Sequence, residues 1–251
     1  MRIIRVEHGG TSYYGILEDG LVFRLHQQPG HMEPIPLSEA KVLPLVTPSK
    51  VVCVGLNYKA HAEELGYPLP NMPSFFLKPP SSIIGNGEPI VLPSGMGRIE
   101  HEAELAMVVG KVCRNLTPEE AEESLFGFTC ANDVTAREVQ KVDPLIGHCK
   151  SYDTFCPIGP WIETELEDIN DLSIRCLVNG EVRQSANTGD MIFRPLDLLC
   201  FLSRVMTLMP GDVILTGTPP GISPIQADDV VQVSIEGIGT LSNPVEGPGP
   251  E

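Results

Sequence analysis

The feature that most constrains the fold is the segment GRIEHEAELAMVVG at residues 97–110, where three glutamates lead into an uncharged apolar run. The run is typical of a buried strand. Because side chains alternate between the faces of a strand, Glu102 and Glu104 point the same way, and Ala103 and Leu105 point the other way. Two carboxylates about 7 Å apart on one face repel each other and are costly to desolvate. The fold must therefore supply water or a cation at this place.

Two interpretations of these acids are open. An exposed acidic face needs no ligand, and the spacing of Glu102 and Glu104 alone favours it. Asp133, in TCANDVTAREVQ, adds a third acid, although an aspartate after an asparagine also commonly caps a turn. If the three acids converge, they form an all-oxygen site that selects Mg²⁺, Mn²⁺ or Ca²⁺ over Zn²⁺.

Charge and cysteine usage limit the function classes. The chain has 17 Lys and Arg against 33 Asp and Glu, a net charge of −16, which disfavours nucleic acid or an anionic membrane as partner. It contains no apolar run of membrane-spanning length, and MRIIRVEHGG lacks the apolar segment and cleavage pattern of a signal peptide, so none is expected. The seven cysteines occur singly, so we expect reduced thiols and a cytoplasmic location, with Cys149 structural.

Turn signals divide the chain into a small N-terminal β-rich domain, residues 1–47, and a larger domain, residues 48–251. RIIRVEHGG, SYYGILEDG and LVFRL are short β-type runs separated by hairpin signals. Residues 26–36 are expected to form a linker or loop. Asn179-Gly180 marks a further hairpin in the larger domain.

Three helices are predicted in the larger domain. Residues 57–66 end at a glycine stop, and residues 116–128 begin with a capping box in which Thr117 is the N-cap and Glu120 is N3. Residues 194–208 form the third. The remainder reads as strands, so we expect a β-rich α+β fold rather than a parallel βαβ array.

Five segments together resemble the fumarylacetoacetate hydrolase superfamily: EHEAELAMVVGK, ANDVTAREVQ, KSYDTFCPIGPW, VNGEVRQSANTGDMIF and MPGDVILTGTPPGI. More narrowly, they are similar to its bacterial acylpyruvate hydrolases and 2-hydroxyhepta-2,4-diene-1,7-dioate isomerase-type enzymes. The resemblance covers roughly residues 50–245 and implies a mixed β-sandwich roll, usually a homodimer. It also implies a divalent metal held by Glu102, Glu104 and Asp133.

The resemblance assigns expected roles to further residues. His61 and Glu64, three apart on one helical face, would form a proton-transfer pair on a mobile segment; without the resemblance they read as a surface pair. Lys150 would supply positive charge to a developing enolate or carboxylate. The other expected substrate-binding residues are Arg137, Gln140, Thr218 and, more weakly, Lys78 at the pocket rim.

Arg137 and Gln140 would share a helical face with Asp133 if all three lay on one helix. The chain departs from the family pattern at Glu100-His101, where Asp-Tyr is usual, and at PLIGHCKSYD, residues 144–153. His101 is expected to be a packing or surface residue rather than a ligand.

The expected function is that of a magnesium-dependent enzyme acting on 2-oxo or 1,3-dicarbonyl acids through a metal-stabilised enolate. C–C hydrolysis of an acylpyruvate is favoured. The alternatives are an isomerase of the 2-hydroxyhepta-2,4-diene-1,7-dioate type, an oxaloacetate decarboxylase, or a non-catalytic dicarboxylate binder. The expected partner is a small 2-oxo or dicarboxylic acid.

Overall fold

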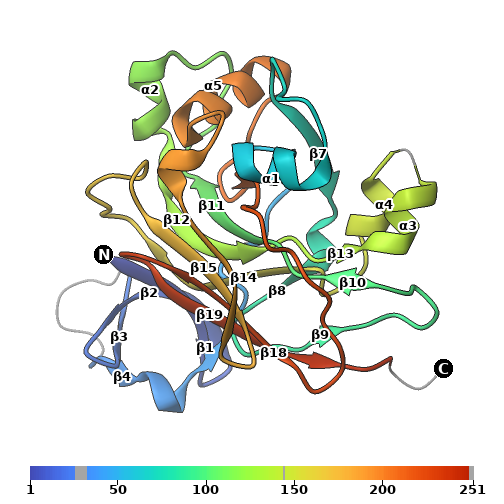
Figure 1. The fold of residues 1–251 in the computed structure, drawn as a ribbon. Coiled ribbons are helices and arrows are strands. Elements are labelled where there is room, and N and C mark those ends of the chain that lie inside the picture. The colour runs from blue at the N-terminus through green and yellow to red at the C-terminus, as the bar shows by residue number, and fades with distance from the viewer. Residues whose placement is uncertain (26–32, 144, 249–251) are drawn as a thin grey trace.

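The computed structural model describes residues 1–25, 33–143 and 145–248. As the sequence predicts, the fold is β-rich with few helices (Figure 1). The N-terminal strands are β1 (Arg2–His8), β2 (Thr11–Glu18), β3 (Leu21–Arg24), β4 (Ile35–Pro36) and β5 (Lys41–Val42). They are followed by β6 (Val51–Gly55), β7 (Ser74–Lys78), β8 (Ile83–Ile84), β9 (Ile90–Val91), β10 (Ile99–Glu100), β11 (Ala103–Val109), β12 (Leu125–Asn132) and β13 (Thr135–Ala136).

The remaining strands are β14 (Cys156–Glu163), β15 (Ser173–Val178), β16 (Glu181–Asn187), β17 (Val213–Leu215), β18 (Val230–Ile235) and β19 (Gly239–Glu246). The α-helices are α1 (Lys59–Leu65), α2 (Pro118–Glu123), α3 (Arg137–Val142), α4 (Gly147–Lys150) and α5 (Pro195–Val205). Short 3₁₀ turns occupy Leu37–Glu39, Pro80–Ser82 and Thr188–Asp190.

Two mixed sheets make up most of the molecule. The larger follows the order β4-β3-β2-β1-β14-β12-β11-β17-β6-β7, with β5 paired to β1 and β8 to β14. The smaller follows β16-β15-β18-β19-β9, and β10 pairs with β13. In Figure 1, α2 and α5 lie at the opposite end of the molecule from the N-terminal strands, and α3 and α4 stand together at one side. The predicted β-rich mixed architecture is confirmed.

The central strand β11 is buried along its whole length. Leu105 and Met107 pack into one hydrophobic cluster, and Ala106 and Val108 into the other. The alternation read from the sequence therefore holds, and both faces of the strand are covered. Glu102 lies immediately before β11, at the end where the apolar run begins.

Pairing of β11 with β12 brings the third acid to the same place. Ala103 lies opposite Asn132, the last residue of β12. The Asp133 N–H donates to the carbonyl of Glu102 at 2.8 Å, and the Glu102 N–H donates to Asn132 Oδ1 at 2.9 Å. The start of β11 and the end of β12 lie side by side, so all three acids are found at the same end of this antiparallel pair.

The helix ends follow local chemistry. Gly66 ends α1 in the left-handed region, with φ 71°, and its N–H reaches the carbonyls of Ala62 and Glu63. The capping box of Thr117 and Glu120 is formed. The predicted helix over 116–128 is too long, however: α2 ends at Glu123, because residues from Leu125 onward pair with β11. Tertiary pairing here overrides the local pattern.

The N-terminal hairpins form as predicted, turning at Gly9-Gly10 and Asp19-Gly20. Strand β1 also pairs with β14, with Ile3 opposite Ile162, so this unit extends the larger sheet. Part of the expected linker, residues 26–32, lies outside the described residues, as does position 144 of PLIGHCKSYD. No helix in the described ranges has the length and apolar character needed to cross a membrane.

Candidate functional site

A cavity of about 290 Å³ opens beside the three acids, at the start of β11 and the end of β12. Its wall is contributed by β6, α1, β7, the start of β11, α3, α4 and the loop after β17. Eight of the ten residues singled out from the sequence line it: His61, Glu102, Glu104, Asp133, Arg137, Gln140, Lys150 and Thr218. The other two, Glu64 and Lys78, hydrogen-bond to members of this set.

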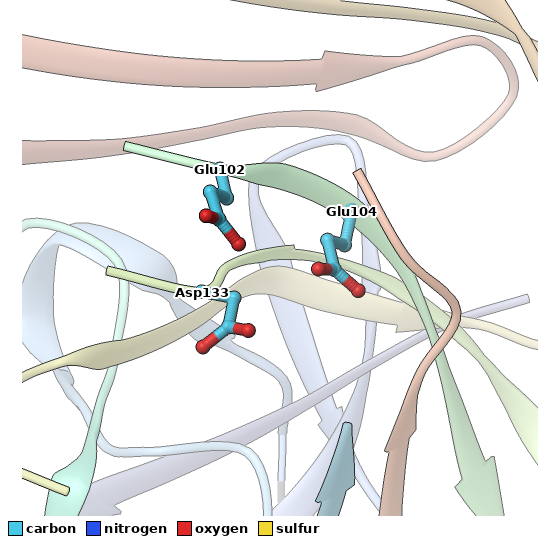
Figure 2. Close-up of side chains that lie close together, drawn as sticks. All are labelled: Glu102, Glu104 and Asp133. Atoms are coloured by element: carbon cyan, nitrogen blue, oxygen red, sulfur yellow. The ribbon is translucent and has the colours of Figure 1, made fainter. Parts of the chain in front are cut away.

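The carboxylates of Glu102, Glu104 and Asp133 converge (Figure 2). Each offers an oxygen, and these oxygens all lie within 4.8 Å of one another. All three side chains are buried, with residue exposures of 5%, 1% and 1%. Three buried carboxylates at this separation require positive charge between or beside them. The exposed-acidic-face interpretation is therefore wrong for these residues.

Two lysine side chains supply part of that charge. Lys150 Nζ donates to Glu102 Oε2 at 2.6 Å and to Asp133 Oδ2 at 2.7 Å. Lys78 Nζ donates to Asp133 Oδ1 at 2.5 Å. Lys78 is 1% exposed, so it lies among the carboxylates and not at the pocket rim where the sequence placed it.

Glu104 is the acid with which neither lysine forms an ion pair. Within the described chain it forms no ion pair; the N–H of Gly217 donates to its Oε2 at 2.5 Å. Burial, together with the charges of Asp133 and Glu102, raises the pKa of Glu104 well above its ordinary value. By contrast, burial would raise the pKa of Glu102, but Lys150 and Arg137 outweigh it and lower that pKa to about 2.

This donor set fits a divalent metal. Hard oxygen ligands converge, they are buried, and one of them, Glu104, forms no ion pair with a basic side chain of the described residues. Glu102, Glu104 and Asp133 would hold the ion, which would lower the raised pKa of Glu104 and so favour its ionised form.

Arg137 is held by several partners at once. Its Nε donates to Glu100 Oε2 at 2.7 Å, its Nη2 to Glu102 Oε1 at 2.5 Å and its Nη1 to Gln140 Oε1 at 2.6 Å. Glu100 also pairs with Arg98. Arg137 and Gln140 lie on α3, but Asp133 precedes that helix, so the idea of one shared helical face is wrong for Asp133.

Glu100 was missed as a site residue by sequence reasoning. It is 1% exposed and anchors Arg137 beside the acids. The available signal was its spacing: Glu100 precedes Glu102 by two residues, as Glu102 precedes Glu104, so strand periodicity alone places it on the same side.

His61 and Glu64 form the expected pair on α1. His61 Nδ1 lies 2.8 Å from Glu64 Oε2, and the His61 side chain is buried while that of Glu64 is about one-third exposed. The other oxygen, Glu64 Oε1, accepts from the N–H of Gly221 at 3.0 Å. Because the carboxylate engages Nδ1, Nε2 is the ring nitrogen available for proton transfer at the cavity.

The segment Thr216–Gly221 connects the parts of the site; we call it the TGTPPG loop. It donates through Gly217 to Glu104 and through Gly221 to Glu64, and Thr218 lines the cavity. Asn57 secures this loop, since its Nδ2 donates to the carbonyl of Thr216 at 2.7 Å. Gly217 has φ 101°, and a Cβ there would lie 2.6 Å from the Cβ of Asn57, so glycine is required.

His101 and Cys149 have structural surroundings, as expected from the sequence. His101 is fully buried, outside the cavity wall, and hydrogen-bonds to Gln184 and Ser223. Burial lowers its pKa despite the opposing effect of Gln184. Cys149 is buried, its Sγ donates to the carbonyl of Ile146, and burial raises its pKa, so it is a poor nucleophile.

Comparisons with known proteins agree with this geometry. Residues 50–246 match the family model described as fumarylacetoacetate (FAA) hydrolase C-terminal, and residues 1–44 match Rv2993c-like, N-terminal. A mitochondrial oxaloacetate tautomerase of Homo sapiens is 42% identical over 225 residues, 84% of this chain and 71% of that protein.

Two solved structures cover nearly the whole chain. The 5-carboxymethyl-2-hydroxymuconate delta-isomerase from Mycobacterium smegmatis is 42% identical with a TM-score of 0.91, covering 100% of each chain. The maleylpyruvate hydrolase from Sphingobium sp. SYK-6, in complex with manganese (II) ion and pyruvate, is 30% identical with a TM-score of 0.83, covering 99% of this chain and 100% of that one. The chain therefore belongs to the fumarylacetoacetate hydrolase family.

Proposed function

We propose that this protein moves a proton on a carbon next to the carbonyl of a small 2-oxo dicarboxylic acid, and so acts as an enol–keto tautomerase or isomerase. The observation that carries the proposal is the meeting of a His61–Glu64 pair, the Lys150 ammonium and three carboxylates at one cavity. A volume of about 290 Å³ suits a small acid. C–C hydrolysis, favoured from the sequence, becomes the second candidate, because the tautomerase and isomerase relatives are more similar than the hydrolase.

In this mechanism His61 removes the proton through Nε2, and Glu64 stabilises the resulting imidazolium through Nδ1. The proton then returns from His61 to another atom of the same molecule, so no co-reactant is consumed. A divalent metal, when bound by Glu102, Glu104 and Asp133, supplies Lewis-acid polarisation of the substrate oxygens.

Lys150 and Thr218 contribute positive charge and a hydroxyl at the same cavity. Lys150 Nζ carries three N–H groups: two donate to the carboxylates of Glu102 and Asp133, and the remaining contact, to the Asp133 carbonyl, is long at 3.5 Å. The third N–H can therefore turn to an oxygen on which charge develops. Arg137, tied to Glu100 and Glu102, keeps the carboxylates in place and borders the same space.

The second candidate is hydrolysis of an acylpyruvate-type C–C bond. It is favoured by the likeness to a maleylpyruvate hydrolase whose structure contains manganese and pyruvate. The same imidazole would remove a proton from water instead of from carbon. The two candidates differ in the second step, so product analysis separates them.

The test is a panel of oxaloacetate, an acylpyruvate and a hydroxy-diene-dioate, each with Mg²⁺, Mn²⁺ or EDTA. Tautomerisation is read as loss of enol absorbance, hydrolysis as pyruvate release and decarboxylation as CO₂. His61→Asn should abolish metal-dependent turnover, while His148→Asn, at a side chain 63% exposed, should not. Metal-dependent turnover that survives His61→Asn would remove the proposed base.

On the resemblance alone we further propose Mg²⁺ or Mn²⁺ as the resident ion, a homodimer and a cytoplasmic location. Light scattering coupled to gel filtration tests the dimer, and metal analysis of the purified protein tests the ion.

A further inference from the structure

Gln184 lies outside the cavity wall but contacts a residue that lines it. It is on β16 of the smaller sheet and is 1% exposed. Its side chain spans the gap between Ala103, at the start of β11, and Thr218 in the TGTPPG loop. Neither the predicted site nor the proposed mechanism uses this buried amide.

Two backbone groups determine which end of the Gln184 amide is the oxygen and which is the nitrogen. The N–H of Ala103 lies 3.0 Å from Gln184 Oε1, and a backbone N–H can only donate. Gln184 Nε2 lies 2.7 Å from the carbonyl of Pro219, which can only accept. A flipped amide would break both hydrogen bonds, so the orientation is determined by chemistry rather than by choice.

This orientation determines what the Thr218 hydroxyl can do. Gln184 Nε2 donates its second hydrogen to Thr218 Oγ1 at 2.8 Å. Because the oxygen of Thr218 accepts this hydrogen bond, its own hydrogen remains to be donated elsewhere. Thr218 lines the cavity, so that hydrogen can be donated to a bound molecule.

We propose that Gln184 is a positioning residue that holds Thr218 as a hydrogen-bond donor toward the substrate. It follows that the atom meeting Thr218 is an acceptor, such as a carboxylate or carbonyl oxygen, and that a donor group at that point is disfavoured. The inference rests on the proposed function, because it takes the cavity as the substrate site.

His101 and Ser223 extend the same arrangement away from the cavity. His101 Nδ1 lies 3.1 Å from Gln184 Oε1, which can only accept, so the ring hydrogen is on Nδ1. His101 Nε2 then accepts from Ser223 Oγ at 2.8 Å. Hydrogen bonds are therefore donated in one direction, from Ser223 to His101, from His101 to Gln184 and from Gln184 to Thr218. In this arrangement the buried His101 helps to hold the Gln184 amide in place.

The test is a double-mutant cycle read by calorimetric binding of oxalate to the Mn²⁺-loaded protein. Gln184→Glu keeps the shape but puts an acceptor opposite Thr218, so the hydroxyl must turn its hydrogen away from the cavity. We expect about a tenfold loss of oxalate affinity, equal to that of Thr218→Val. In the Thr218→Val background, Gln184→Glu should cost less than about twofold.

Controls separate this role from charge and from folding. Gln232→Glu adds the same charge on β18, which is separated from β16 by β15 in the same sheet, and should bind oxalate like the wild type. Gln184→Met, which is uncharged and cannot donate, replaces Gln184→Glu if thermal melting shows that the latter does not fold.

Additive losses in the cycle would overturn the inference, because they would mean that Gln184 acts through charge or general packing. This outcome is distinct from failure of the proposed function. The binding cycle does not depend on turnover, so it can succeed when no panel substrate reacts, and it can fail when His61-dependent turnover is intact.

Discussion

Replacing Lys150 with methionine tests the electrostatic account of the acid cluster. Lys150 is 3% exposed, and its ammonium contacts Glu102 and Asp133 at 2.6 and 2.7 Å. Removing one partner of a buried ion pair costs about 3–5 kcal/mol, because the remaining charges stay buried. For a chain of this size each kcal/mol shifts Tm by about 2–4 °C, so the metal-free variant should melt about 6–20 °C lower.

Metal should reverse part of this loss. An ion that binds only the folded state stabilises it by about 2.7 kcal/mol when present at 100 times its Kd. Without the competing ammonium, the three acids carry more uncompensated negative charge, so Mn²⁺ should bind Lys150→Met more tightly than the wild type. Melting in EDTA and in a Mn²⁺ series, followed by calorimetry, measures both effects.

Lys50→Met is the matched control. Lys50 Nζ pairs with the fully buried Asp212 at 2.5 Å, near the far end of β11, where the N–H of Val109 bonds to the Asp212 carbonyl. This variant should also lose stability, but Mn²⁺ should raise its Tm no more than that of the wild type. Equal Mn²⁺ effects in the two variants, or an unchanged Tm for Lys150→Met, would refute the reasoning.

Two further predictions concern other residues. Glu64→Gln should lower turnover by on the order of 10²-fold or more in steady-state kinetics, because an amide cannot stabilise an imidazolium as a carboxylate does; Glu63→Gln, one position earlier and exposed, should change it little. Asp212→Asn should cost about 1–3 kcal/mol in urea unfolding at pH 7. Burial would raise the pKa of Asp212, but Lys50 and the N–H of Met209 lower it overall. Its contribution is therefore complete above the unfolded pKa, near 4, and the difference between wild type and variant should shrink as pH falls below that value. A pH-independent difference would contradict this assignment.

The acid cluster could be read from the sequence because it follows from strand periodicity. Glu102 and Glu104 are two residues apart, and the apolar run after them predicts a buried strand. The arrival of Asp133 could not be derived in this way. It depends on the register that sets Ala103 opposite Asn132, and register is a property of the paired strands rather than of either one.

The ion pairs of the site could not be predicted from the sequence alone either. Lys78 reads as an ordinary lysine after the apolar run FFL, yet the pairing of β6 with β7 buries it beside Asp133. Gln184 gave no signal either, since its partners Ala103 and Thr218 are distant in sequence. The helix over 116–128 was predicted too long for the converse reason, because its second half had a strand partner that local propensity does not register.

The divided carboxylate of Glu64 has a consequence for when the enzyme can react. One oxygen contacts Nδ1 of the His61 ring and the other accepts from the N–H of Gly221, so the carboxylate that orients the imidazole also joins α1 to the TGTPPG loop. A displacement of α1 that broke the Gly221 contact would leave the Glu64 carboxylate free to rotate away from the His61 ring. The orientation of the His61 ring would therefore depend on whether α1 is in contact with the TGTPPG loop.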